Sequence, residues 1–377
     1  MAPALLKDLF LLLLNNYNLL KNIVYIYIMY DIVITWVDWT SKQLHDKMLE
    51  YGGRSERCES GDFIELKYVL RSLKKHKVAY RNIFIVHSDN HEPPKYLKET
   101  NTLKFVKHSE IVKDKKHLPL IHRESILVHL HRIPNLSNYF FHLQDDQFIM
   151  NSKIFEEVLN SYNNNQIYVK RKKMKQTYDV NKPTGLYRLA MINSSLIFNK
   201  NIDNVIQQTH WVDFYDKSIL NKIEQLYPKH FLYTQSYQNQ KKETYKEKYI
   251  IALPCIFYNY LIYIKKFDSV DANKLNIVEI WTNGYTNNSD LTSVKDKLKL
   301  STEKWILNAQ GNGISDEYPK CETVHKLFYN FLEDTFKKKT EYEKDFKGGS
   351  NNNQQTTIYI LFILFILFIL IQKCKKN

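Results

Sequence analysis

The chain has few cysteines and none of the cysteine spacings that build small disulfide-stapled or zinc-binding domains. The four stand far apart, outside any Cys-x-x-Cys or cysteine-histidine pattern, at Cys58, Cys255, Cys321 and Cys374. Neither a zinc site nor a disulfide framework is therefore indicated, and cysteine usage leaves the cellular compartment open. The 377 residues suffice for one large core or two moderate ones, which excludes disorder of the whole chain.

The chain also lacks the signatures of a nucleic-acid-binding protein, although its formal net charge is +14. Such a charge attracts anions, which could be nucleic acid, acidic lipid headgroups or a phosphorylated small substrate. The densest basic run, residues 170–175, has neither the interleaved aromatic residues nor the glycines of an RNA-binding strand. We therefore interpret it as a solvated loop. A nucleic-acid binder, which only the net charge favours, would bind with strong salt dependence.

Three apolar segments, which we predict to be strands, end in acidic or imidazole side chains: residues 31–38, 82–89 and 139–146. Continuous apolar runs are typical of strands buried on both faces, and ligands of such sheets bind outside the carboxyl ends of the strands. We therefore expect Asp38, His87, Asp89, Asp145 and Asp146 to share one edge of a sheet. The alternative is that aspartate ends strands because it favours turns.

Apolar spacing predicts helices over residues 61–76 and 125–130, between the strands. The alternation gives βαβ units, and hence an α/β fold with a Rossmann-like, mostly parallel sheet flanked by helices. Residues 151–248 are polar, basic and loop-like, which predicts irregular insertions or a smaller subdomain. Helical patterning returns at residues 249–264 and 324–336.

The end of the chain is the clearest non-globular feature. We interpret residues 341–357 as a linker, the apolar run 358–371 as a transmembrane helix and residues 372–377 as a cytosolic tail. The run is shorter than the roughly 17 to 25 residues that normally span a bilayer, but long lysines can snorkel from a thinned one. The alternative is a buried core helix, which would have little to pack against beyond a flexible spacer.

The lysines of the tail predict the topology. Lys373, Lys375 and Lys376 would keep the C-terminus cytosolic, which places the remaining body in the lumen of the ER or Golgi as a single-pass membrane protein. The spacing of Lys373 and Lys375 resembles a dilysine retrieval signal. Small residues at 348–350 before an apolar tail also suit a lipid-anchor signal, against which the charged end argues. Residues 1–30 form a weak signal or anchor segment.

Several ordered blocks of the chain resemble the Stealth family of sugar-1-phosphate transferases, which includes capsule-polymer synthases and the enzyme that makes the mannose-6-phosphate precursor on lysosomal glycoproteins. The segment Asp31-Ile-Val-Ile-Thr-Trp-Val-Asp38 looks like the first block, and the second begins at Glu65 and continues to Phe148. Its pieces lie at residues 65–76, 81–86, 106–111, 118–119, 130–137 and 144–148. Residues 209–211 and 305–318 look like the third and fourth blocks.

Three departures from the family pattern stand out. Leu118-Pro119 continues as Leu-Ile-His-Arg-Glu-Ser-Ile126, where members commonly have Thr-Phe, then an asparagine or serine, and soon a glutamate. Gln144 stands where an asparagine usually precedes the two aspartates. Residues 236–242 offer lysines, such as Lys241, where an arginine is expected, and lysine lacks the bidentate fork that grips phosphate. The departures suggest a divergent acceptor or a loss of activity.

The resemblance implies a GT-A-like fold and the transfer of a hexose-1-phosphate, for example N-acetylglucosamine-1-phosphate, from a nucleotide sugar to a hydroxyl of a glycan or glycoprotein acceptor. The product is a phosphodiester, and the donor is expected to be UDP-linked. Such a reaction needs a base, positive charge around the diphosphate and usually a hard divalent cation. We expect Mg²⁺ or Mn²⁺ at Asp145 and Asp146, because these carboxylates crowded with Asp38 require a cation or a raised pKa.

The resemblance also assigns roles to residues. Catalysis is expected of Asp146, Asp316 and His210, with His210 as the general base because its ordinary pKa is near 7. Donor or substrate contacts are expected of Asp31, Trp36, Asp38, Arg71, His108 and Asn308. Blander alternatives are a turn for Asp145, a solvated helix face for Arg71, and a plain glycine turn near Asn308 and Asp316.

These expectations divide the chain into the first half of a catalytic domain at residues 31–151, a basic insertion with the third block at 152–248, and the rest of the domain at 249–340. Two rival functions stay open. One is a glycosyltransferase that attacks the sugar carbon and releases UDP. The other is a catalytically inactive, membrane-anchored glycan-binding protein, which the missing arginine and the altered second block favour.

Overall fold

The structure is a computed structural model, and it describes residues 30–38, 41–50, 65–174, 183–199, 204–207, 211–235, 249–281, 288–310 and 321–344. Residues 1–29, most of the predicted linker, the predicted transmembrane helix at 358–371 and the tail lie outside this part of the chain. Within it, no helix has both the length and the apolar character needed to cross a membrane.

A five-stranded sheet forms the centre of the body, in the order β3-β2-β1-β4-β8. Its strands are β1 (Asp31–Thr35), β2 (Ile83–His87), β3 (Leu103–Lys107), β4 (Tyr139–Gln144) and β8 (Asp213–Asp216). The first four are parallel to one another, and β8 runs antiparallel to β4. The predicted α/β fold with a mostly parallel sheet is therefore confirmed. Strand order reverses between β1 and β4, which is the switch point where open α/β sheets bind ligands.

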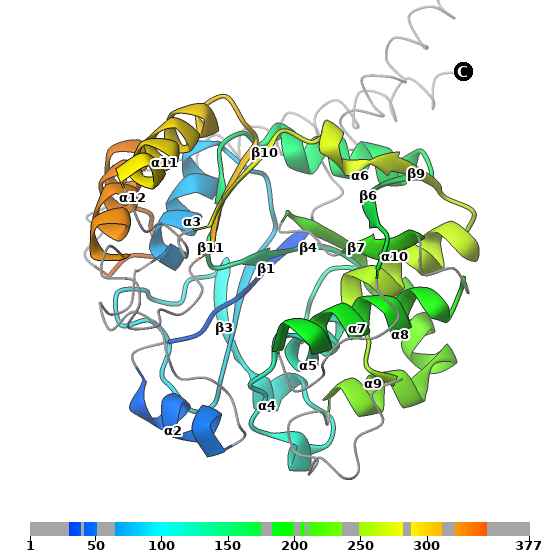
Figure 1. Ribbon diagram of the computed structural model, residues 1–377. Helices are drawn as coiled ribbons and strands as arrows, with labels where there is room; N and C mark the ends of the chain where they lie inside the picture. Colours follow the sequence, from blue (N-terminus) through cyan, green and yellow to red (C-terminus); the bar gives the residue numbers. More distant parts are fainter. Residues whose placement is uncertain are drawn as a thin grey trace, which may run out of the picture.

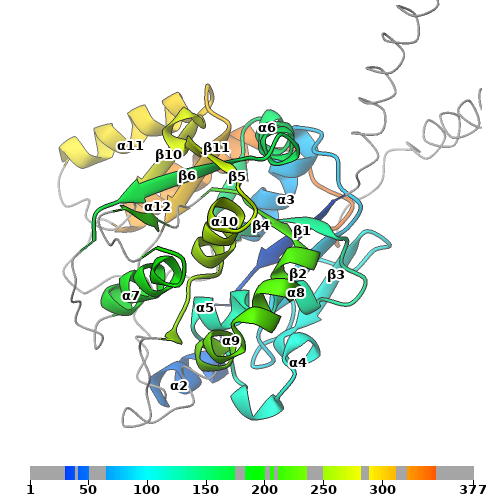
Figure 2. The same cartoon turned by 90° about the vertical axis from the view of Figure 1, so that its right-hand side faces the viewer.

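Helices cover both faces of this sheet, with α3, α11 and α12 on one side and α5, α8 and α9 on the other (Figures 1 and 2). In chain order the helices are α2 (Lys42–Glu50), α3 (Glu65–Lys75), α4 (His108–Ile111), α5 (Arg123–Leu127), α6 (Lys153–Asn163), α7 (Pro183–Leu196), α8 (Lys217–Leu226), α9 (Pro228–Gln235), α10 (Leu253–Tyr263), α11 (Asn288–Ser301) and α12 (Cys321–Thr335). Short 3-10 turns are η1 (Lys115–His117), η2 (Leu130–Arg132) and η6 (Ala272–Lys274).

The apolar periodicity of the sequence accounts for the central elements. Ile32, Val33 and Ile34 of β1 are all fully buried, as expected for a strand with helices on both faces. Helix α3 confirms the first predicted helix within its described residues, and α10 and α12 confirm the two later ones. The helix predicted at residues 125–130 is shorter, because α5 ends at Leu127 and a separate 3-10 turn follows.

Two small sheets flank the central one. The first has the order β10-β11-β5, with β5 (Gln147–Ile149), β10 (Ile277–Trp281) and β11 (Ile306–Gln310). The second has the order β7-β6-β9, with β6 (Gln166–Lys172), β7 (Val205–Gln207) and β9 (Asp268–Asp271). Two residues separate the end of β4 from the start of β5, and the backbone N–H of Ile149 donates to Ser72 Oγ of α3 at 2.9 Å.

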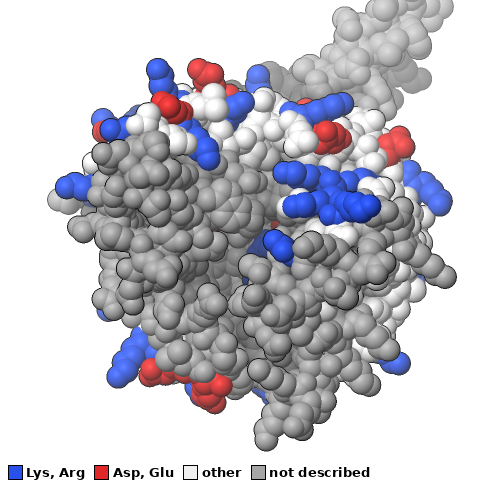
Figure 3. Space-filling view, viewed as in Figure 1, with Lys and Arg blue, Asp and Glu red and all other residues white. Residues whose placement is uncertain are grey.

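The loop predicted for residues 170–175 is wrong over its first three residues, which belong to β6. Ile167 and Val169 are buried in β6, whereas Lys170, Arg171 and Lys172 follow one another at its end, and basic side chains gather over this strand in Figure 3. The irregular insertions expected within residues 151–248 are also wrong, because their described residues form helices and strands, whereas a smaller subdomain there stays a prediction. The run of successive charges masked the strand, since it interrupts the alternation of apolar and polar residues. The division of the chain at residues 151 and 248 stays a prediction, although β8 from the middle part joins the central sheet.

Asp31 fixes the starts of three parallel strands. Its side chain is fully buried, and its carboxylate accepts hydrogen bonds from Arg81 Nε at 3.0 Å and Nη2 at 2.6 Å. The same carboxylate accepts from the backbone N–H of Asn82 at 3.0 Å and of Ser137 at 2.6 Å. Since these residues precede β2 and β4, Asp31 joins the amino ends of β1, β2 and β4.

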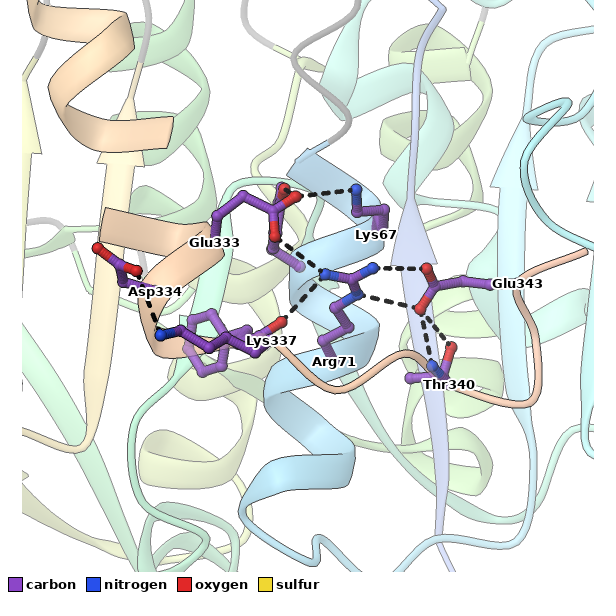
Figure 4. A network of polar contacts seen from close by, with 9 residues as sticks. Lys67, Arg71, Glu333, Asp334, Lys337, Thr340 and Glu343 are labelled. Carbon is purple, nitrogen blue, oxygen red and sulfur yellow. Dashed lines mark hydrogen bonds and ion pairs between the residues drawn. The ribbon is translucent and has the colours of Figure 1, made fainter. Parts of the chain in front are cut away.

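Arg71 joins α3 to the last described segment, residues 336–344 (Figure 4). Its side chain is 4% exposed and forms a bidentate ion pair with Glu343, with Nε to Oε1 at 3.0 Å and Nη2 to Oε2 at 2.7 Å. The Nη1 atom donates to the carbonyl of Phe336 at 3.1 Å and lies 3.4 Å from Glu333. The solvated helix face considered for Arg71 is therefore wrong, and its predicted phosphate contact would compete with this network.

The Arg71–Glu343 pair generates a prediction about stability. Glu343→Gln should lower the free energy of unfolding by about 3 kcal/mol, because it leaves a buried guanidinium without its counter-charge. Glu341→Gln is the matched control on the same segment, where the partner Lys74 and Glu341 itself are both largely exposed, and should cost less than about 1 kcal/mol. Urea unfolding of the full chain measures both, and equal losses would contradict a dominant buried pair.

Candidate functional site

The carboxyl edge of the central sheet gathers most of the predicted site residues that the structure describes. Thr35 of β1 and Gln144 of β4 are paired in register, so the chain leaves both strands at the same level. The residues that follow these two strands are Trp36, Val37 and Asp38 after β1, and Asp145 and Asp146 after β4. Asp89 follows β2 and His108 follows β3 at the same edge.

Other predicted site residues lie elsewhere or outside the described chain. Asp31 begins β1, so it lies at the opposite, amino edge, where its carboxylate is fully engaged as described above. Asn308 lies within β11, in register with Gln147, the residue after Asp146. His210 and Asp316 lie outside the described residues. Gln147, which is fully buried, donates from Nε2 to the carbonyl of Trp211 at 3.1 Å.

Asp145 and Asp146 form the two-residue turn that joins β4 to β5, and both are half-buried. Among the described residues, no group of three histidine, cysteine or acidic side chains could hold a metal ion. Mg²⁺ commonly binds through one or two carboxylates, with waters and substrate phosphates as its other ligands. Two adjacent carboxylates at a strand end fit that arrangement, so the metal role of this pair stays a prediction that its chemistry supports.

His91, which the sequence gave no reason to select, holds the segment after β1. Its Nε2 accepts a hydrogen bond from the backbone N–H of Asp38 at 3.4 Å, while its Nδ1–H donates to the carbonyl of Glu92 at 3.2 Å. The Trp36 ring packs on it edge to face, with ring centroids 4.9 Å apart. Burial lowers the pKa of His91, which keeps the imidazole neutral and Nε2 able to accept.

His108 lies at the edge as a neutral group. Its side chain is 2% exposed, and burial, aided by His87 and His91 nearby, lowers its pKa to about 3. The ring therefore carries no positive charge at neutral pH. Its predicted role in binding donor phosphate or sugar, which stays a prediction, would have to rest on a neutral hydrogen bond.

A second polar cluster lies at this edge between β1, β4 and β8. The Nε2 atom of His142, on β4, is 3.1 Å from Thr35 Oγ1, and its Nδ1 is 3.5 Å from an Asp213 carboxylate oxygen on β8. The Tyr258 hydroxyl of α10 donates to Asp213 at 3.4 Å. His142 and Asp213 are each 1% exposed. Burial lowers the pKa of His142, so the imidazole is neutral.

Arg123 and Glu124 at the start of α5 complete this cluster. Arg123 Nη1 lies 3.5 Å from Glu124 Oε1, and Arg123 interacts electrostatically with Asp213. Glu124 is 1% exposed, and burial raises the pKa of its carboxyl to about 7 against the opposing effect of Arg123. The signal in the sequence was the departure after Leu118-Pro119, which contains both residues but gives no hint of their burial.

The chain matches known proteins in this same region. Residues 60–168 match the family model of Stealth protein CR2, conserved region 2. A capsular polysaccharide phosphotransferase of Actinobacillus pleuropneumoniae is 29% identical over 196 residues, which cover 48% of this chain and 52% of the relative. One of Haemophilus influenzae is 36% identical over 129 residues, which cover 32% of this chain and 34% of the relative. The chain thus spans about half, or less, of the curated relatives it matches.

Among solved structures, a galactosyltransferase LgtC aligns over 82% of this chain and 98% of its own length, with 8% identity and a TM-score of 0.36. A likeness of that size does not bear on function. The sequence matches confirm the resemblance to the Stealth family, and the region matched by the family model runs from α3 through β2, β3 and β4 and includes the Asp145-Asp146 turn.

The raised pKa of Glu124 generates a prediction about pH. Between pH 4.5 and about 7 the unfolded chain releases this proton while the folded chain keeps it. The free energy of unfolding should therefore fall across that window by roughly 3 kcal/mol and then level off. Glu124→Gln cannot ionise and should lack this fall. Other titrating groups are common to both proteins, so they cancel in the difference between the two curves.

Denaturant unfolding of both proteins at half-unit intervals from pH 4.5 to 8 measures that difference. Glu303→Gln, which changes an exposed glutamate, is the control and should run parallel to the wild type. A Glu124→Gln curve that also runs parallel would show that the carboxyl titrates normally in the folded protein.

Proposed function

We propose that this chain, a member of the Stealth family through its conserved region 2, is a sugar-1-phosphate transferase. It would move a hexose-1-phosphate from a nucleotide sugar, expected to be UDP-linked, to a hydroxyl of an acceptor glycan and so form a phosphodiester. The observation that supports the proposal is that Trp36 and Asp38 follow β1 while Asp145 and Asp146 follow the neighbouring strand β4, so both segments leave the sheet at the switch point. Asp145 and Asp146 also lie inside the region matched to the family. The relatives named phosphotransferases support the reaction class.

The edge offers groups suited to each part of such a reaction. Asp38 is held in place through its backbone by His91, and the Asp145-Asp146 turn faces the same edge from the adjacent strand. A divalent cation bound there would neutralise charge on the donor diphosphate. His210, which directly precedes the described Trp211, is proposed as the base that takes the proton of the attacking hydroxyl, and Asp316 as a second catalytic residue.

The remaining features of the proposal rest on sequence. A GT-A-like form of the α/β fold, a metal requirement, a membrane anchor at residues 358–371 and a location in the ER or Golgi membrane are proposed together with the reaction.

The released nucleotide tests the reaction type. The full chain, purified in detergent, is incubated with UDP- and GDP-sugars and glycan acceptors, with and without Mn²⁺, and the nucleotide product is identified. Sugar-phosphate transfer predicts a nucleoside monophosphate. Release of the diphosphate alone would show attack at the sugar carbon, as in a glycosyltransferase. Glycan binding without nucleotide release from any donor would favour the inactive binding protein.

The Asp145-Asp146 turn generates a matched set of substitutions. Asp146→Asn should lower kcat/KM for monophosphate release at least about 100-fold, since it removes a charge at the reacting centre without changing the shape of the side chain. Asp145→Asn should raise the Mn²⁺ concentration needed for half-maximal rate. Asp114→Asn, which removes an exposed carboxylate before η1, is the control and should change the rate less than twofold. Full activity of Asp146→Asn would remove this turn from the mechanism.

A further inference from the structure

The guanidinium of Arg123 has N–H donors that no acceptor among the described residues satisfies. Its Nη1 lies at the long distance of 3.5 Å from Glu124, and its Nε and Nη2 atoms are buried without a hydrogen-bond partner among the described residues. The side chain keeps 27% of its exposure, so the residue still reaches the surface. Arg71 is the contrast, because carboxylate and carbonyl oxygens engage all three of its nitrogens.

Arg123 lies near the switch point, to which His142 connects it. It interacts with Asp213 on β8 and with His142 on β4, and His142 contacts Thr35, the last residue of β1. Trp36 follows Thr35 directly, and Asp145 follows Gln144, the register partner of Thr35. Arg123, at the start of α5, therefore belongs to the polar cluster of His142 and Asp213, which borders the candidate site.

We propose that the guanidinium of Arg123 binds the diphosphate of the nucleotide-sugar donor, and that the Glu124 carboxyl takes up a proton when that anion binds. The inference rests on the proposed function for the identity of the anion. A guanidinium presents two parallel N–H donors to phosphate oxygens, which the lysines of residues 236–242 cannot do. The segment that departs from the family pattern thus supplies the arginine that is missing further along the chain.

The charges around Arg123 explain why a proton must accompany the anion. The groups that face it are Asp213 and Tyr215 from β8, Tyr187 from α7, His142 from β4 and Glu124 from α5. Burial keeps the imidazole and both phenols neutral. Arg123 and the Asp213 carboxylate balance each other, so an ionised Glu124 would repel an entering phosphate.

The pKa of Glu124 determines how donor affinity should change with pH. Burial already raises the pKa of Glu124 to about 7, and a phosphate beside it would raise that pKa further. Binding of the anion is therefore coupled to proton uptake above pH 7. Donor affinity should weaken as pH rises from 7 to 8, by up to about tenfold for one proton.

Binding of UDP to the full chain, measured by calorimetry, tests the arginine. Arg123→Gln should weaken UDP binding about 10- to 100-fold, the range expected for losing hydrogen bonds to a charged group, and Arg123→Lys should recover only part of it. Arg171→Gln removes the same charge from β6 and is the matched control, with an expected change below twofold. Equal losses in Arg123→Gln and Arg171→Gln would reduce the effect to net charge, and wild-type affinity in Arg123→Gln would overturn the proposal.

Glu124→Gln tests the proton. It should bind UDP at least as tightly as the wild type at pH 6 and more tightly at pH 8, and the ratio of the two affinities isolates Glu124 from the titration of UDP itself. Calorimetry in buffers of different ionisation enthalpy should detect proton uptake in the wild type at pH 8 and lower uptake in the variant. An affinity ratio that does not change with pH would overturn the coupling.

Arg123→Gln leaves Glu124 buried without its neighbour, so folding must be checked. The double variant Arg123→Gln with Glu124→Gln removes both charges and avoids an unpaired buried carboxylate. It should unfold at a temperature close to that of Glu124→Gln and still bind UDP about 10- to 100-fold more weakly than that single variant. If it folds and binds UDP as Glu124→Gln does, Arg123 has no part in anion binding.

The nucleotide product separates this inference from the proposed function. If Arg123→Gln weakens UDP binding about 10- to 100-fold while the wild type releases UDP from a UDP-sugar, the arginine site stands and the phosphotransferase reaction fails. If the wild type releases UMP and Arg123→Gln does so with unchanged KM, the reaction stands and the arginine site fails.

Discussion

The buried carboxylate of Asp31 is the constraint on which the site depends. By accepting hydrogen bonds from Arg81 and from the backbone at the starts of β2 and β4, it sets the level at which three parallel strands begin. Strands that start at one level and run in register also end at one level, so the far ends of β1 and β4 release Asp38 and the Asp145-Asp146 turn side by side. Asp31, which we expected to contact substrate, thus lies at the opposite edge and fixes the strand ends that carry the candidate site.

Two buried charged pairs of this chain differ in how completely their hydrogen-bonding groups are satisfied. Arg71 and Glu343 form a bidentate ion pair that holds the end of the described chain against α3, which is a structural role. Arg123 and Glu124 lie as close in sequence as two residues can, yet they leave donor and acceptor atoms unused at the carboxyl edge. Unsatisfied buried charge costs free energy, so a fold that retains it at a switch point has a reason connected with binding.

Local patterns made the central fold predictable, and distant contacts limited the prediction of the site. The strand ends at Asp38 and Asp146 and the helix α3 follow from apolar runs a few residues long. The partner of Arg71 lies 272 residues away, and nothing in the local sequence distinguishes Glu343 from the exposed Glu341. The sequence also gave no sign of the role of His91, because that role comes from the contact of its Nε2 with the backbone N–H of Asp38. Strand β6 was missed because it ends in three successive basic residues, which hide the alternation of the strand.

The position of Arg123 and Glu124 in the fold gives a physical explanation for the departure from the family pattern after Leu118-Pro119. Arginine and glutamate at the start of α5 place a charged pair near the carboxyl edge, where burial raises the pKa of Glu124 to about 7. Apolar replacements of similar volume are often neutral or stabilising for a buried charged pair, so stability alone gives no reason for this one. A half-satisfied pair near the switch point therefore fits the proposed change in how the donor is bound better than an inactive protein.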